Sequence, residues 1–266
     1  MKQLRFIKTL LMFMIKEKIL YPESLIADIV IVFARCGILL LLYSYIFAFK
    51  GSVINETTFQ VAGWSMFFYF AFMNLRIRSL TTSIMQDIKS GNIEVLFSKP
   101  VQYLLYRYWW QIGEGLYSFL VTTIGGTVLM ILFVGIPNSV TTIFFLVTFC
   151  FTFIFSILLS LLIYSVIGLF AFWIEDVKPL YWIIDKMIMI LGGSYLPVAL
   201  FPKFMYLFAV YSPFGASQFI THTVYESWKT NAYMMMGIQF GWVVIFGVIV
   251  SFMFGFAYKK VSVNGG

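Results

Sequence analysis

The stretch "VTTIFFLVTFCFTFIFSILLSLLIYSVIGLFAF" (Val140 to Phe172) contains no charged residue and is longer than a membrane crossing requires. The hydrocarbon core of a bilayer needs about 20 consecutive apolar residues of α-helix. The rest of the 266-residue chain is similar, with 61% hydrophobic and 11% charged residues, whereas a soluble domain carries about 25% charged residues. Because the strand-period alternation of an outer-membrane barrel is absent, the sequence predicts an all-α membrane protein.

Working outward from this stretch, we expect six transmembrane helices within a single transmembrane domain over residues 1–266. The predicted spans are 25–49, 58–75, 103–134, 140–172, 180–200 and 233–257. The third and fourth exceed the length that a bilayer needs, so they would tilt or extend beyond the hydrocarbon.

Before the first span, residues 1–22 combine basic and apolar positions at helical spacing. Lys2, Arg5, Lys8 and Lys16 fall on one side of a helix, and most of the apolar side chains fall elsewhere. This pattern predicts an interfacial (elbow) helix that lies in the membrane surface. A frayed basic tail is the alternative.

Basic residues indicate the orientation, because cytoplasmic loops carry an excess of Lys and Arg. With both termini cytoplasmic, the outside of the membrane holds only Lys50, Lys203 and Lys229. The cytoplasmic side then holds Lys2, Arg5, Lys8, Lys16, Lys18, Arg76, Arg78, Lys89, Lys99, Arg107, Lys178, Lys259 and Lys260. We therefore expect a cytoplasmic loop at 76–102 and an external segment at 197–231. The membrane is expected to be the plasma (cell) membrane of a bacterium, crossed several times.

The external segment 197–231 is too apolar for a solvated loop. Pro197, Pro202, Pro213 and Gly215 interrupt it too often for one continuous span. Irregular backbone at membrane depth must be buried in protein. Short re-entrant helices before the last span fit these constraints.

In the cytoplasmic loop, "TTSIMQDIKSG" (Thr81 to Gly91) predicts a short helix that ends at Gly91. Its apolar positions form an edge for which the sequence shows no obvious packing surface within the chain, and polar residues flank that edge. A partner groove would explain the edge; packing on the chain's own spans or on headgroups is the alternative. The candidate docking residues are Ile84, Met85, Asp87, Ile88, Lys89, Gly91 and Glu94.

Charged residues also occur inside the predicted spans: Arg35, Asp28, Glu114 and Asp185, the last followed by Lys186. An arginine at the centre of a membrane helix costs about 2.5–3.5 kcal/mol on insertion scales. Such residues therefore line a wet pathway, or they form ion pairs that fix helix packing. Both explanations stay open for these positions.

The chemistry of a catalytic site is missing. The chain has no G-x-x-x-x-G-K-[ST] motif, no nucleophile paired with a base, and a single histidine, His222, that we expect at a surface or interface rather than on a metal. Cys36 and Cys150 lie in separate spans, as packing residues do. The net charge of +7 is explained by membrane orientation and anionic lipids, so we expect no nucleic-acid partner. The chain is therefore not predicted to be an enzyme.

Two local stretches carry a family resemblance: "IKSGNIEVLFSKPVQYLLYR" (Ile88 to Arg107) and "LPVALFPKFMYLFAVYSPFGA" (Leu196 to Ala216). Together with the predicted architecture, they resemble the permease (transmembrane) subunit of a type-2 ABC exporter. One departure is Lys99, where the family pattern leads us to expect Arg before the proline. The likeness of architecture covers nearly the whole chain.

The resemblance implies that the loop 76–102 carries a coupling helix that docks on a separate ABC ATPase subunit. That partner would bind ATP and Mg, and this chain would hold no cofactor. A second permease chain, identical or homologous, would complete a translocation pathway lined by the first, second and fifth spans and surrounded by membrane lipids. The family transports drugs, lipids, peptides or glycans, and the sequence does not choose among them.

The main alternative is an ion- or proton-coupled secondary transporter or channel. It would use Arg35, Asp28, Glu114 and Asp185 as a relay and would need no ATPase. A membrane-embedded lipid enzyme is disfavoured by the missing catalytic groups.

Overall fold

The computed structural model describes residues 2–20, 23–51, 53–54, 57–97 and 102–264, without the side chains of 2–8, 18, 24–25, 28, 50 and 258–264. Nearly all of this is helix. The α-helices are α1 Lys2–Leu20, α2 Glu23–Lys50, α3 Phe59–Met73, α4 Leu80–Lys89, α5 Asn92–Phe97, α6 Tyr103–Phe133, α7 Ile143–Leu169, α8 Lys178–Leu191, α9 Lys203–Tyr211, α10 Pro213–Ala216 and α11 Trp228–Asn264. The 3-10 helices are η1 Ile77–Ser79, η2 Asn138–Thr141, η3 Phe170–Phe172, η4 Val198–Leu200 and η5 Phe219–Val224.

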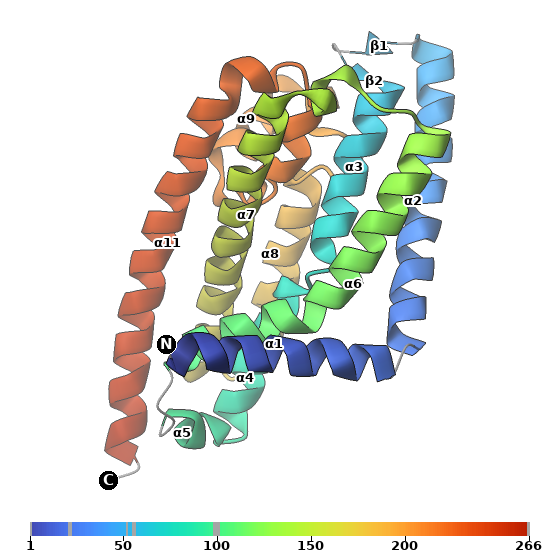
Figure 1. Cartoon of the computed structure of the whole chain (residues 1–266). Coiled ribbons are helices and arrows are strands. Elements are labelled where there is room, and N and C mark those ends of the chain that lie inside the picture. The colour runs from blue at the N-terminus through green and yellow to red at the C-terminus, as the bar shows by residue number, and fades with distance from the viewer. Residues whose placement is uncertain (1, 21–22, 52, 55–56, 98–101, 265–266) are drawn as a thin grey trace.

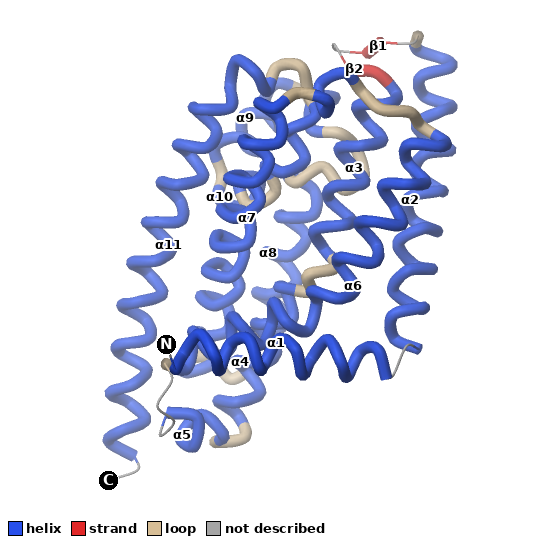
Figure 2. Tube along the Cα trace, in the orientation of Figure 1, coloured by secondary structure: helices blue, strands red, loops and turns tan. Residues whose placement is uncertain are grey.

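A short antiparallel hairpin joins β1 (Val53–Ile54) to β2 (Thr57–Thr58), with Val53 opposite Thr58. Figure 1 shows the long helices running side by side, with this hairpin and α9 at one end of the bundle. At the other end α1 lies across the bundle, and α4 and α5 lie beyond it (Figures 1 and 2). We call these the hairpin end and the α1 end.

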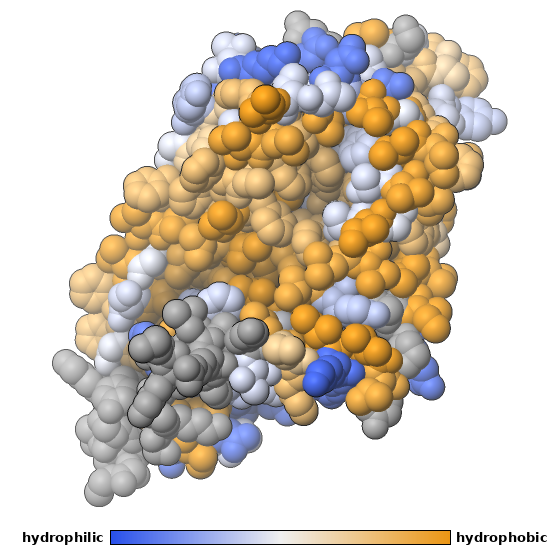
Figure 3. Space-filling model, viewed as in Figure 1, coloured by the Kyte–Doolittle hydropathy of each residue, from blue (hydrophilic) through white to orange (hydrophobic). Residues whose placement is uncertain are grey.

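Within the part of the chain that the structure describes, four helical stretches are long and apolar enough to cross a membrane: Ile29–Phe49 in α2, Tyr103–Phe133, Ile143–Phe172 and Trp228–Ala257. The chain is therefore an all-α, membrane-embedded, multi-pass protein. Figure 3 shows apolar side chains in a broad band across the visible face, between more hydrophilic ends. The second and fifth predicted spans correspond to α3 and α8, which are only 15 and 14 residues long.

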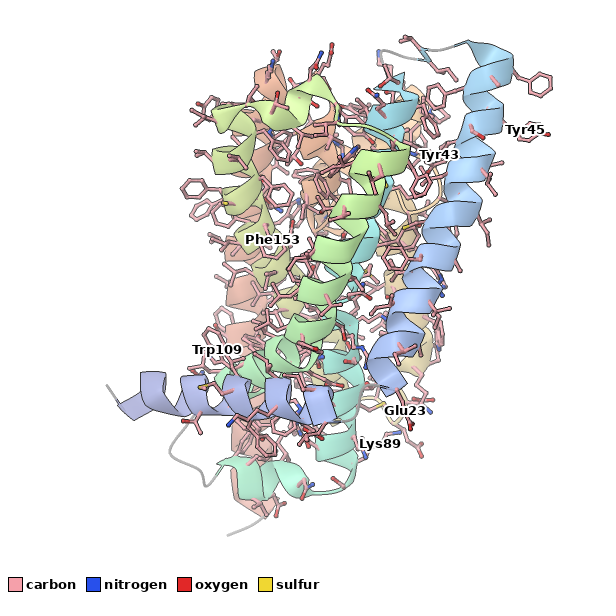
Figure 4. The ribbon with its side chains drawn as sticks, turned by 45° about the vertical axis from the view of Figure 1, so that its right-hand side comes forward. Glu23, Tyr43, Tyr45, Lys89, Trp109 and Phe153 are labelled. Carbon is pink, nitrogen blue, oxygen red and sulfur yellow. The ribbon has the colours of Figure 1, made fainter. Side chains whose placement is uncertain are left out.

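The helix α3 lies at the centre of the bundle because it is apolar on every side. All of its residues from Val61 to Phe72 are buried, as expected for a helix without a polar face. The helix α2 packs on it from outside. In Figure 4 the side chain of Tyr43 points from α2 into the bundle, and that of Tyr45 points away; the Tyr43 hydroxyl donates to the Tyr195 carbonyl at 2.9 Å.

Two helix ends follow from glycine. As predicted, the helix in the cytoplasmic loop, α4, stops just before Gly91, whose φ of +73° is a left-handed conformation that glycine adopts at little cost. The predicted span 180–200 is wrong at its end. The helix α8 stops at Leu191, because Gly193 has a φ of +82° and the Ser194 amide turns back to the Met189 carbonyl.

The segment 197–231 is broken into η4, α9, α10 and η5, so the prediction of several short helices instead of one span holds. Its tightest point is Gly215, where a Cβ atom would lie 2.0 Å from the Ala209 carbonyl oxygen. The surface position expected for His222 is wrong. Its side chain is 3% exposed, because η5 is buried among α3, α7 and α11.

Candidate functional site

A cavity of about 350 Å³ opens between α2, α3, α6 and α8, next to the turn that follows α3. Its polar wall consists of Arg35, Tyr69, Asn74, Arg76, Arg78, Ser79 and Glu114. Its apolar wall consists of Ile31, Val32, Phe70, Met73 and Met189. Three guanidinium groups thus face a space that also has a hydrophobic side.

The turn after α3 positions two of these arginines. Arg76 has a φ of +53° and is the one non-glycine among the described residues with a positive φ. For an ordinary side chain this conformation costs roughly 1–2 kcal/mol. The turn is held by its carbonyl oxygen, which accepts hydrogen bonds from the Gln111 side chain at 3.0 Å and from the Ser79 amide and hydroxyl at 2.9 Å.

A glycine of α6 allows this turn to lie against the helix. A Cβ atom on Gly115 would lie 2.3 Å from the Leu75 carbonyl oxygen, so only glycine admits the backbone of the turn at this depth. The same stretch of α6 supplies Gln111 and Glu114. Strained residues held in this way cluster at functional sites, and this one points its side chain toward the cavity.

The Arg76 guanidinium lies opposite a carboxylate of α6. The Arg76 Nη1 and Glu114 Oε1 atoms are 4.0 Å apart, and both side chains are about one third exposed (31% and 34%). Such a pair contributes about 0–1 kcal/mol. Arg35 and Arg78 are exposed to the cavity and form no salt bridge to any described side chain.

Of the predicted intramembrane charges, the cavity brings together Arg35 and Glu114. Asp185 does not line the cavity, although it interacts electrostatically with Tyr69, which does. It is 2% exposed, and its carboxylate accepts a hydrogen bond from the Tyr164 hydroxyl at 2.9 Å. The neighbouring Lys186 lies over the Trp182 ring, 5.4 Å from its centroid. The side chain of Asp28 lies outside the described residues.

Sequence reasoning missed Tyr69, Asn74, Arg76 and Arg78 as lining residues. In the sequence, the two arginines indicate only the orientation of the chain. A signal was present in "NLRIRS" (Asn74 to Ser79), where arginines alternate immediately after an apolar helix. Their approach to Arg35 depends on how α2 packs on α3, which no local pattern reports.

A second polar cluster ties α4 to α6. The Asp87 carboxylate is 4% exposed and accepts two hydrogen bonds from Arg107, one of them from Nε at 2.7 Å and the other from Nη2. The Tyr103 hydroxyl donates to the same carboxylate at 2.6 Å. Bidentate arginine–carboxylate pairs are among the strongest hydrogen-bonded contacts in proteins. We call these three residues the Asp87 cluster.

The expectation that the apolar edge of α4 lacks a cover within the chain is wrong. Ile84 is fully buried and Met85 is 9% exposed, because α4 packs on α7. A Cβ on Gly168 would lie 2.9 Å from the Ile84 Cβ, and the Thr81 hydroxyl donates to the Tyr164 carbonyl at 2.8 Å.

Asp87, expected as a rim contact, is likewise buried inside the chain. Ile88 is half-buried. Of the predicted docking residues, Lys89, Gly91 and Glu94 are exposed, at the α1 end where Figure 4 labels Lys89.

No family model and no curated protein matches the chain.

Proposed function

We propose that this chain is the transmembrane subunit of an ATP-driven exporter of the type-2 ABC class. It would form a translocation pathway with a second permease chain, and a separate ATPase subunit would dock at α4 and α5. In this proposal α3 and α8 are short spans beside the four long ones, both termini are cytoplasmic, and the helices of 197–231 dip back into the outer leaflet.

The observation that carries the proposal is the attachment of α4. This short helix lies beyond α1 at one end of the bundle (Figure 1) and is fixed to two long apolar helices. The Asp87 cluster joins it to α6, and the Ile84–Gly168 contact joins it to α7. A solvated connector needs neither contact, whereas a coupling element must transmit force into the membrane-spanning helices.

The helix α6 continues the path from this attachment to the cavity. Arg107, Gln111 and Glu114 are spaced at i, i+4 and i+7, so they lie on one face of the helix. Arg107 donates to the Asp87 carboxylate, and Gln111 donates to the Arg76 carbonyl. Glu114 faces the Arg76 guanidinium. At 1.5 Å per residue this stripe spans about 10 Å. Displacement of α4 would therefore reach the walls of the cavity through one rigid helix.

The helix α1 is attached to the same part of α6. Met14 is 4% exposed, and a Cβ on Gly113 would lie 2.6 Å from its sulfur atom. An ATPase closing beneath the bundle would thus act on α6 through both α4 and α1.

The docking surface in this proposal differs from the one expected from the sequence. It consists of the exposed residues at the end of α4 and on α5: Lys89, Gly91, Glu94 and Val95, the last 62% exposed. Ile84, Met85 and Asp87 would serve the attachment of α4 instead of touching the partner.

The test is purification of the tagged full chain from its native membrane, with ATP hydrolysis measured in the eluate. We expect the wild type to bring an ATPase with it and Glu94→Arg to reduce the recovered activity at least about tenfold. The matched control is Glu226→Arg, which replaces an exposed carboxylate at the hairpin end. This variant should leave the recovered ATPase activity unchanged. Recovery of no ATPase, or equal recovery with both variants, would overturn the proposal.

The ion-coupled alternative gains no support from the arrangement of the described charges. Arg35 and Glu114 share the cavity, but Asp185 is buried against Tyr164 and does not line it. Transport that continues without ATP and stops when the proton gradient collapses would favour this alternative.

A further inference from the structure

The cavity described above has the composition of an anion site. Among the described residues that line it, three arginines outnumber one carboxylate, which leaves a net charge of +2. Arg35 and Arg78 are free of any salt bridge to a described side chain. Guanidinium groups at membrane depth face water or an opposite charge, so this cavity is a favourable place for an anion.

The chemistry of the donors favours phosphate. A guanidinium presents a planar fork of N–H donors that matches the oxygens of a phosphate group. Tyr69 adds a further donor: its hydroxyl is buried, lines the cavity and makes no hydrogen bond of normal length to a described residue, although Ser194 lies near it. Two negative charges on one ligand group would neutralise the site.

The position of the cavity favours a ligand from the membrane. Arg35 lies six residues after Ile29, where the apolar stretch of α2 begins, or about 9 Å along the helix at 1.5 Å per residue. The outward face of α2 around it is apolar and exposed: Val30 is 59% and Ile38 66% exposed. The apolar wall formed by Ile31, Phe70 and Met189 offers a surface for the start of an acyl or prenyl chain.

We propose that this cavity binds the phosphate headgroup of a membrane amphiphile, with Arg35, Arg76 and Arg78 on the phosphate and Glu114 limiting the affinity so that the ligand can leave. The binding claim stands without an ATPase. That the bound amphiphile is the exported substrate rests on the proposed function above. Because Arg76 is held by the same face of α6 that holds α4, movement at the docking surface would change the separation of these arginines.

The test is binding to the purified full chain in detergent, measured by native mass spectrometry with dioctanoyl phosphatidic acid, dioctanoyl phosphatidylcholine and inorganic phosphate. We expect phosphatidic acid to bind at least about tenfold more tightly than either of the others. Arg35→Gln and Arg78→Gln should each weaken its binding about tenfold, the effect of losing one hydrogen bond to a charged group. The matched control is Lys186→Gln, an exposed cation on α8 outside the cavity, which should have no effect.

One variant guards against misfolding as an explanation. Glu114→Gln removes the one carboxylate among the described residues that line the cavity and should tighten phosphatidic acid binding several-fold, a gain that a damaged protein does not give. Equal losses in Arg35→Gln and Lys186→Gln would overturn the proposal, because the attraction would then be unspecific. Inorganic phosphate binding as tightly as phosphatidic acid, or no gain in Glu114→Gln, would also overturn it. ATPase recovery with Glu94→Arg is measured separately, so failure of one proposal does not imply failure of the other.

Discussion

His222 is the one histidine of the chain, and it is packed as an aromatic core residue. Its ring meets Phe219 and Tyr225 edge-on, with centroids 5.2 and 5.7 Å away. Its Nε2 atom has no hydrogen-bond partner among the described residues. Burial without a counter-charge lowers the pKa of His222 from 6.5 to about 3.

This depressed pKa predicts acid sensitivity. In the unfolded chain the histidine binds a proton below about pH 6.5, whereas in the folded chain it stays neutral down to about pH 3. The folded state is therefore favoured fully above pH 6.5 and loses about 1.4 kcal/mol per pH unit as the pH falls toward 3, or about 2 kcal/mol at pH 5. The measurement is the thermal unfolding midpoint in detergent at pH 7.5 and 5. His222→Gln should reduce the difference, and an unchanged difference would contradict the assignment.

The burial of Asp87 could not be predicted from its residue type. In sequence it is an acidic residue on a short polar helix, and the natural expectation was solvent or a partner. Its burial depends on Arg107 and Tyr103, which follow 20 and 16 positions later on another helix. Predicting it would have required the packing of α4 on α6.

The Asp87 cluster gives a stability prediction at the same scale. Asp87→Ala leaves the Arg107 guanidinium, whose side chain is 15% exposed, without its carboxylate. Breaking one side of a buried pair costs about 3–5 kcal/mol. Glu94→Ala, on the exposed face of α5, should change stability by less than about 0.5 kcal/mol. Thermal unfolding in detergent compares the two, and similar midpoints would show that the pair is not a structural tie.

At the scale of elements, sequence patterns predicted what depends on local chemistry. The N-terminal helix, the short helix before Gly91 and the breaks at Pro202 and Pro213 follow from spacing, glycine and proline. That the N-terminal helix lies in the membrane surface stays a prediction. The partner of each face was not predicted. The apolar edge of α4 was the feature that suggested a docking groove, but α7 covers Ile84 and Met85 because Gly168 lets the two helices approach.

Gly168 therefore tests how α4 is attached. A Cβ there would lie 2.9 Å from the Ile84 Cβ, so Gly168→Ala should push α4 from α7 and cost about 1–3 kcal/mol, as overpacking does. The matched control is Gly247→Ala on α11, where no atom lies within 4 Å of the added methyl. It should be neutral or stabilising by up to about 1 kcal/mol, because alanine favours a helix over glycine. Unfolding midpoints of the two variants give the comparison, and equal effects would mean that α4 adjusts freely on α7.

At the scale of the whole molecule, hydropathy predicted the positions of the helices in the bundle. It could not predict the cavity between them. Each predicted span corresponds to a helix of the bundle, although α3 and α8 are shorter than about 20 residues and their crossing of the membrane stays a prediction. The cavity collects residues from α2, α3, α6 and α8. Arg35 and Arg76 are far apart in sequence. They line the same cavity because the other helices pack around α3, which is apolar on every side.

Orientation in the membrane is the last prediction, and it tests the molecule as a unit. The α1 end carries Lys89, and the hairpin end carries Asn138 and Lys203, all three exposed. The excess of basic residues on loops at the α1 end predicts that this end is cytoplasmic. In intact cells, with Cys36 and Cys150 replaced by Ala, single cysteines at Asn138 and Lys203 should react with an impermeant thiol reagent. A cysteine at Lys89 should react only after permeabilisation. Labelling of the cysteine at position 89 from outside would show that the α1 end faces outward. The docking surface would then lie outside the cytoplasm, and a cytoplasmic ATPase could not be its partner.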